Sequence, residues 1–140
     1  MGKTFHVGNR EASLLSKIES SKERERHRSI HVVRDNVDVF SNKVSMKLVE
    51  EGLVETVSKN SIQEQISKCI ETLCRAEDFD IDFQIAPFRT IVQNPNIVSL
   101  YLTAFVVEKL INHKDVIEIY GSDEDIYFCI QKITAQFLEA

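Results

Sequence analysis

Glycine and proline are scarce in this chain, and no other feature of the sequence constrains the fold as much. The 140 residues include 4 Gly and 2 Pro, whereas average proteins contain about 7% and 5%. Neither residue occurs between Gly8 and Gly52. Because Gly and Pro form tight turns and end helices, a chain with so few of them has few turns and long helices. The sequence therefore predicts a mainly α fold.

Two segments of the chain share one pattern: a helix end, a short β-like tripeptide and an amphipathic helix. The tripeptides are Leu53-Val54-Glu55 and Val116-Ile117-Glu118. We expect them to lie in corresponding places, either paired as strands or related by a pseudo-two-fold axis, with helices 62–75 and 123–138 packed on the same side. Neither unit can bury its apolar face alone, so stacking the two makes one core.

The predicted fold class is α+β and mainly α, with long N-terminal helices, two similar helix-strand-helix units and two or three short strands. The length and the 43% hydrophobic content fit a single domain over residues 1–140. We expect an N-terminal helical arm at about 9–30, a first unit at about 31–76 and a second at about 96–140.

Five apolar residues alternate in spacings of three and four, as the a and d positions of a heptad do. These residues, the candidate interface of a homo-oligomer, are Ile30, Val33, Val37, Phe40 and Val44. The preceding stretch, Glu19 to Ser29, has no apolar residue. The region therefore forms either two helices or one helix whose middle projects into solvent.

The segment 79–85 alternates apolar and polar residues, which favours a strand. A helix with Ile81, Ile85 and Phe88 on one face is the alternative. After Asn94-Pro95-Asn96, a helix apolar nearly all round extends to His113, which predicts the buried centre of the core or of an oligomer.

The charge of the chain is uneven. Residues 1–70 carry a net charge of +2 and residues 71–140 carry −7, so a nucleic-acid contact would have to use the first half. That half contains the only basic cluster, which is a candidate contact for an acidic partner or a nucleic acid: Lys22, Arg24, Arg26 and Arg28. Opposite charges three residues apart also fit a solvated helical face, which is the favoured interpretation.

The longest apolar run, Ile97 to Val107, is well short of the ~20 residues that a membrane span needs. An apolar signal-peptide core is also missing, so we expect a cytoplasmic protein without membrane contact. Three cysteines argue against a disulfide framework, and Cys69 and Cys129 fall on apolar stripes where buried thiols are expected.

Groupings that carry catalysis or bind metal are not evident in the sequence. On a continuous helix, His27, His31, Asp35 and Asp38 would share one face and could form a metal or acid–base site. They also flank the apolar stripe, where polar residues are expected. The acidic residues at 123–125 are explained by a helix N-terminus. We therefore expect no catalytic residue, no metal and no cofactor.

Two resemblances concern the region of Lys47-Leu48-Val49-Glu50-Glu51-Gly52-Leu53-Val54-Glu55. Residues 44–55 resemble the end of a winged-helix recognition helix running into its wing, which implies a DNA-binding regulator using residues 22–55. Residues 44–85 are similar to an uncharacterised family of bacterial cytosolic proteins, which implies no activity. The prediction is a non-enzymatic interaction or scaffold protein that forms a homo-oligomer and also contacts another protein; the DNA-binding regulator is the alternative.

Overall fold

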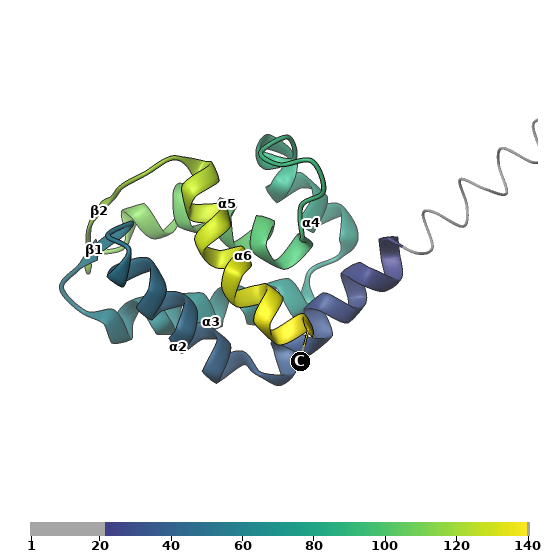
Figure 1. Ribbon diagram of the computed structural model, residues 1–140, viewed down its shortest axis with the longest axis horizontal. Helices are drawn as coiled ribbons and strands as arrows, with labels where there is room; N and C mark the ends of the chain where they lie inside the picture. The colour runs from purple at the N-terminus through teal and green to yellow at the C-terminus, as the bar shows by residue number, and fades with distance from the viewer. Residues whose placement is uncertain (1–21, 140) are drawn as a thin grey trace, which may run out of the picture.

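The computed structural model describes residues 22–139, and this part of the chain is a mainly helical α+β fold. It begins with an N-terminal helix over residues 22–35. The remaining elements are α2 (Val37–Glu50), β1 (Val54–Thr56), α3 (Lys59–Arg75), α4 (Asp78–Ile85), the 3-10 helix η1 (Ala86–Phe88), α5 (Ile97–Glu108), the 3-10 helix η2 (Leu110–Asn112), β2 (Val116–Ile119) and α6 (Asp123–Glu139). The two strands lie at one end of the molecule and α4 lies toward the other (Figure 1). The predicted fold class is confirmed.

A turn at Asn36 separates the N-terminal helix from α2. The Asn36 side-chain amide donates a hydrogen bond of 2.8 Å to the carbonyl of Val32, so it competes with the helical hydrogen bonds at this point. The described part therefore contains two helices here, with the junction inside the apolar stripe. Residues 9–21 of the predicted arm lie outside the described residues.

The two tripeptides of the repeat pair as antiparallel strands, as predicted. Val54 lies opposite Ile119, Glu55 opposite Glu118, and Thr56 opposite Val116 after a register shift. The pair is extended on both sides: the Tyr120 amide donates to the Leu53 carbonyl at 2.8 Å, and the Val57 amide donates to the Asp115 carbonyl at 3.0 Å.

The helices of the two units pack against each other. The first unit is α2-β1-α3 and the second is α5-β2-α6. Helix α3 contacts both α2 and α5, and α6 also contacts both α2 and α5. Each unit therefore covers the other, and residues of both units form one hydrophobic cluster.

Helix α5 is the centre of that cluster. Every residue from Val98 to Ala104 is buried, which confirms the expectation drawn from its all-round apolar sequence. The buried hydroxyl groups of Ser99 and Thr103 have partners: Ser99 Oγ lies 2.9 Å from Thr134 Oγ1, and Thr103 Oγ1 donates to the Ser99 carbonyl at 2.7 Å. These two hydroxyl groups are therefore buried without the penalty of an unsatisfied polar group.

The strand prediction for residues 79–85 is wrong, because this segment is the helix α4. Ile81 and Ile85 are buried, and Phe88 continues their stripe in η1. Aspartates in the first turn suit the positive end of the helix dipole. The sheet of the described residues is two-stranded and does not include this segment.

Gly121 is expected to be sensitive to substitution. Its φ is +85°, and an added Cβ would lie 2.8 Å from Leu53 Cδ2. We expect Gly121→Ala to lower the free energy of unfolding by about 2 kcal/mol through strain and steric overlap. The matched control is Gly52→Ala: φ is +72° there but an added Cβ meets nothing within 4 Å, so about 1 kcal/mol is expected. Urea unfolding measures both, and equal losses would contradict the assigned contact with Leu53.

Candidate functional site

The candidate oligomer stripe faces the interior of the chain itself. Val33, Phe40 and Val44 are fully or almost fully buried, and Ile30 and Val37 are partly buried against the same core. Phe40 also makes an edge-to-face contact with Phe137 of α6, with ring centroids 5.4 Å apart. The stripe is therefore occupied by intramolecular packing, and a second copy would have to bind at another face. The homo-oligomer stays a prediction.

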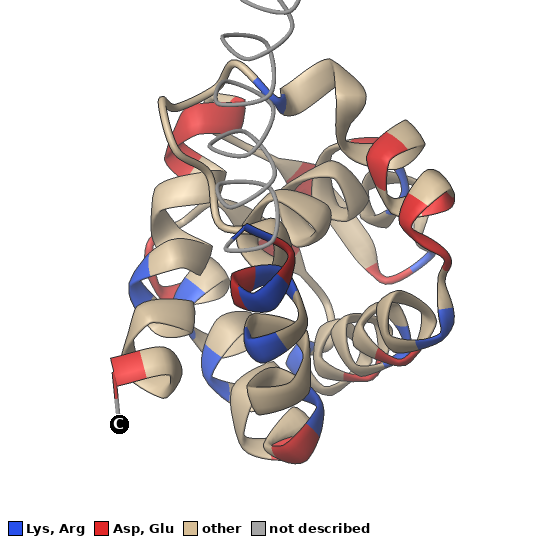
Figure 2. Ribbon diagram, turned by 90° about the vertical axis from the view of Figure 1, so that its right-hand side faces the viewer, with Lys and Arg blue, Asp and Glu red and all other residues tan. Residues whose placement is uncertain are grey.

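Arg26 and Arg28 of the basic cluster contact other parts of the chain. Arg26 contacts Asp78 Oδ1 at 3.3 Å and Asp82 Oδ1 at 2.8 Å, and Arg28 donates to the Leu138 carbonyl at 2.7 Å. Lys22 and Arg24 have exposed side chains. In Figure 2, the N-terminal helix, which continues the grey trace, carries both basic and acidic segments. Part of the cluster thus holds this helix in place.

The four His and Asp residues of the candidate metal or acid–base site lie on two different helices. His27, His31 and Asp35 lie on the N-terminal helix, and Asp38 lies on α2 beyond the turn. His31 is exposed, with Nε2 3.5 Å from Asp35 Oδ2 and Nδ1 2.6 Å from an Arg34 nitrogen. Among residues 22–139, no group of three or more His, Cys, Asp or Glu side chains is placed to hold a metal ion.

The three cysteines are free thiols in environments that disfavour the thiolate. Burial raises the pKa of Cys69 above the normal thiol range, and burial with the nearby Glu51 carboxylate raises the pKa of Cys129 to about 12. The pKa of Cys74 is also raised, chiefly by burial, although Arg34 and Arg75 lower it in part. None of the three has the lowered pKa of a nucleophilic cysteine.

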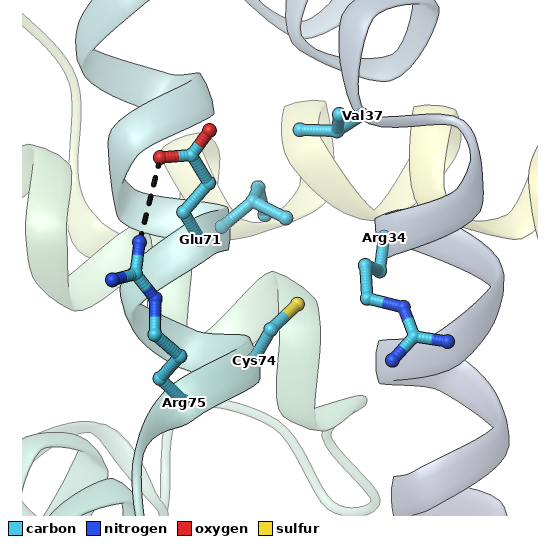
Figure 3. Close-up of a pocket in the computed structure, with 6 residues that line it drawn as sticks. Arg34, Val37, Glu71, Cys74 and Arg75 are labelled. Atoms are coloured by element: carbon cyan, nitrogen blue, oxygen red, sulfur yellow. Dashed lines mark ion pairs between the residues drawn. The ribbon is translucent and has the colours of Figure 1, made fainter.

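Cys74 borders a cavity of about 310 Å³ between α3 and the N-terminal helix, lined by Arg34, Val37, Ile70, Glu71, Cys74 and Arg75. The Cys74 sulfur points from α3 toward Arg34, while Arg75 pairs with Glu71 at 3.7 Å (Figure 3). The cavity therefore combines an apolar floor with partly paired charges.

A wider groove of about 530 Å³ lies between the N-terminal helix, α4 and the segment before α5. Its charged lining includes Arg26 of the N-terminal helix, Asp78 and Asp82 of α4, and Arg89 at the end of η1. Asp82 Oδ1 accepts a hydrogen bond from Arg26 at 2.8 Å and forms an ion pair with Arg89 at 2.9 Å, so one carboxylate oxygen contacts two guanidinium groups.

Beside this groove, the outer face of α4 exposes two phenylalanines. Phe79 and Phe83 are each 76% exposed, more than any other large hydrophobic side chain among residues 22–139. They are four residues apart, so they are neighbours on the helix surface. Sequence reasoning missed this pair. The helical alternative for the segment contained the signal, because placing Ile81 and Ile85 inward directs both phenylalanines outward.

A second exposed apolar area lies at the sheet end of the molecule. Val57, Ile117 and Tyr120 are all exposed there. Tyr120 Oη donates to Glu55 Oε1 at 3.1 Å, and this hydrogen bond to a carboxylate raises the pKa of Tyr120. Acidic and apolar side chains thus occur together at both ends of the molecule.

No family model, curated protein or solved structure matches this chain. The similarity of residues 44–85 to an uncharacterised bacterial family therefore stays a prediction. In the structure, β1 is followed by α3 and pairs with β2 of the second unit. Within the described residues, no helix is long and apolar enough to cross a membrane.

Labelling of the three cysteines tests how deeply each thiol is buried. Cys69 and Cys129 are buried and Cys74 is partly exposed, so we expect maleimide to modify Cys74 slowly in the folded protein and the other two only after unfolding. Mass spectrometry of peptides after timed labelling measures the order. Equal labelling rates at all three positions under native conditions would contradict the burial described.

Proposed function

We propose that this chain is a non-enzymatic interaction or scaffold protein whose contact surface includes the outer face of α4. The observation that carries the proposal is the exposure of Phe79 and Phe83, each 76%, side by side on one helix face. Single exposed apolar residues are common, but adjacent large aromatic side chains on a surface are typical of protein contacts.

The energetic gain from covering these rings is substantial. A buried Phe side chain removes about 150–250 Å² from water, so covering the exposed part of both removes roughly 300 Å² and contributes on the order of 7 kcal/mol before the costs of association. Such a gain is comparable to that of the anchor residues that dominate many interfaces.

Helix α4 also holds the pair in a fixed position. Ile81 and Ile85 anchor its inner face in the core, and Arg26 contacts two aspartates on its flank. A surface that is ordered before binding loses less conformational entropy when a partner binds.

The chemistry of the side chains supports a non-enzymatic role and a cytoplasmic location. The thiols have raised pKa values, and His31 is exposed beside Arg34. Free thiols are typical of reducing compartments such as the cytosol. Against the alternative of a DNA-binding regulator, Arg26 and Arg28 already bind groups of this chain.

We expect Phe79→Ser combined with Phe83→Ser to change the free energy of unfolding by less than about 0.5 kcal/mol, because neither ring contributes much to the core. By contrast, Ile81→Ser should cost about 3 kcal/mol or more, because it empties a buried site and buries a hydroxyl group. Urea unfolding compares the variants. A large loss from the phenylalanine changes would show that the rings are structural.

In-cell photo-crosslinking tests the proposed contact. Benzoylphenylalanine at position 79 of the full chain should yield a defined adduct in the source cells, identified by mass spectrometry. The control is position 39, since Val39 is 54% exposed but lies on α2. Light scattering of the purified chain then separates a second copy from a different partner. No adduct at position 79, or equal adducts at both positions, would overturn the proposal.

A further inference from the structure

We infer that the outer face of α4 binds a basic amphipathic helix of another protein. The inference rests on the proposed function and specifies the chemistry of the partner. The partner's apolar side chains would cover Phe79 and Phe83, and its Lys or Arg side chains would pair with carboxylates beside them.

The charges on α4 point to such a partner. All charged residues of the helix and its N-cap are acidic: Glu77, Asp78, Asp80 and Asp82. At 100° per residue, Asp78 and Asp82 lie along one flank of the phenylalanine pair and Asp80 lies along the other. The first flank is partly neutralised by Arg26 and Arg89, whereas the exposed Asp80 forms no ion pair within 4.0 Å with any other residue of the range 22–139.

The chain itself shows how this helix accepts a cation. Arg26, which is 22% exposed, extends from the N-terminal helix to Asp78 and Asp82. One flank of α4 is thus already bound by an arginine from a neighbouring helix. The phenylalanine face and Asp80 offer a partner the corresponding combination of apolar and acidic groups.

Positively charged side chains near α4 determine which part of its outer face stays acidic. Arg89 is 52% exposed and pairs with Asp82 at 2.9 Å, so it places a positive charge at the edge of the binding face. Lys109 lies on the side of Gln84, with Nζ 3.4 Å from Oε1. The acidic character is therefore strongest toward the N-terminal end of α4, where Glu77 and Asp80 lie.

A second copy of this chain suits the face less well. If two α4 helices met face to face, the aspartates beside the phenylalanines would approach each other, and like charges at an interface oppose association. The net charge of −5 adds repulsion between whole molecules. A basic partner would instead be attracted both to the aspartates beside the phenylalanines and to the negatively charged molecule as a whole.

Peptide binding to the full chain tests the inference. The probes are two fluorescein-labelled peptides of about 18 residues, long enough to form a helix: one amphipathic peptide of Leu and Lys, and one with Glu in place of every Lys. Fluorescence anisotropy at physiological salt measures both. We expect the Lys peptide to bind roughly tenfold more tightly or better, because opposite charges are paired and like charges are avoided.

Variants locate the binding. The double change Phe79→Ser and Phe83→Ser should weaken binding of the Lys peptide roughly tenfold. Asp80→Asn should weaken it roughly threefold and Arg89→Ala should strengthen it by a similar factor, since the two changes move the local charge in opposite directions. Val39→Ser, an exposed apolar position on α2, should have no effect.

Two outcomes would overturn the inference. Equal affinity for the Lys and Glu peptides would show that charge does not select the partner. Equal affinity of the wild type and the double phenylalanine variant would show that the peptide binds elsewhere. Neither outcome decides the proposed function, which depends on the crosslink at position 79 in cells; a crosslink to a second copy there would support self-association and overturn the basic-partner inference.

Discussion

The pairing of β1 with β2 is the constraint on which the rest of this fold depends. Each strand is three or four residues long, and a short two-stranded sheet has little stability of its own. It persists because each strand joins two helices, and each of the helices α3 and α6 contacts both α2 and α5. The strands fix the relation between the units, and the helices supply the buried surface that keeps the strands paired.

The repeated pattern made this arrangement predictable from the sequence. Leu53-Val54-Glu55 and Val116-Ile117-Glu118 each follow a helix and precede an amphipathic one, and such units commonly bury their apolar faces against each other. The all-round apolar composition of residues 97–107 likewise indicated the buried centre, because a helix without a polar face has to be covered on every side.

Other features of the fold depend on tertiary packing, which local sequence patterns do not contain. The spacing of Val33, Phe40 and Val44 identifies an apolar stripe, but it does not say whether the covering surface belongs to the same chain. Here α6 provides it, through contacts such as Phe40 with Phe137. Strict alternation at residues 79–85 suits a strand only where a sheet edge is available, and tertiary packing of Ile81 and Ile85 selects the helix instead.

The alternating pattern of α4 also has a consequence for the unfolded chain. When this helix melts, Phe79 to Ile85 becomes a seven-residue segment with four large apolar side chains, which is the length and composition that forms intermolecular β-structure. Asp80 and Asp82 interrupt it, and charges within such a segment oppose the stacking of identical strands. We therefore expect the aspartates of α4 to oppose aggregation of chains in which this helix has not yet formed.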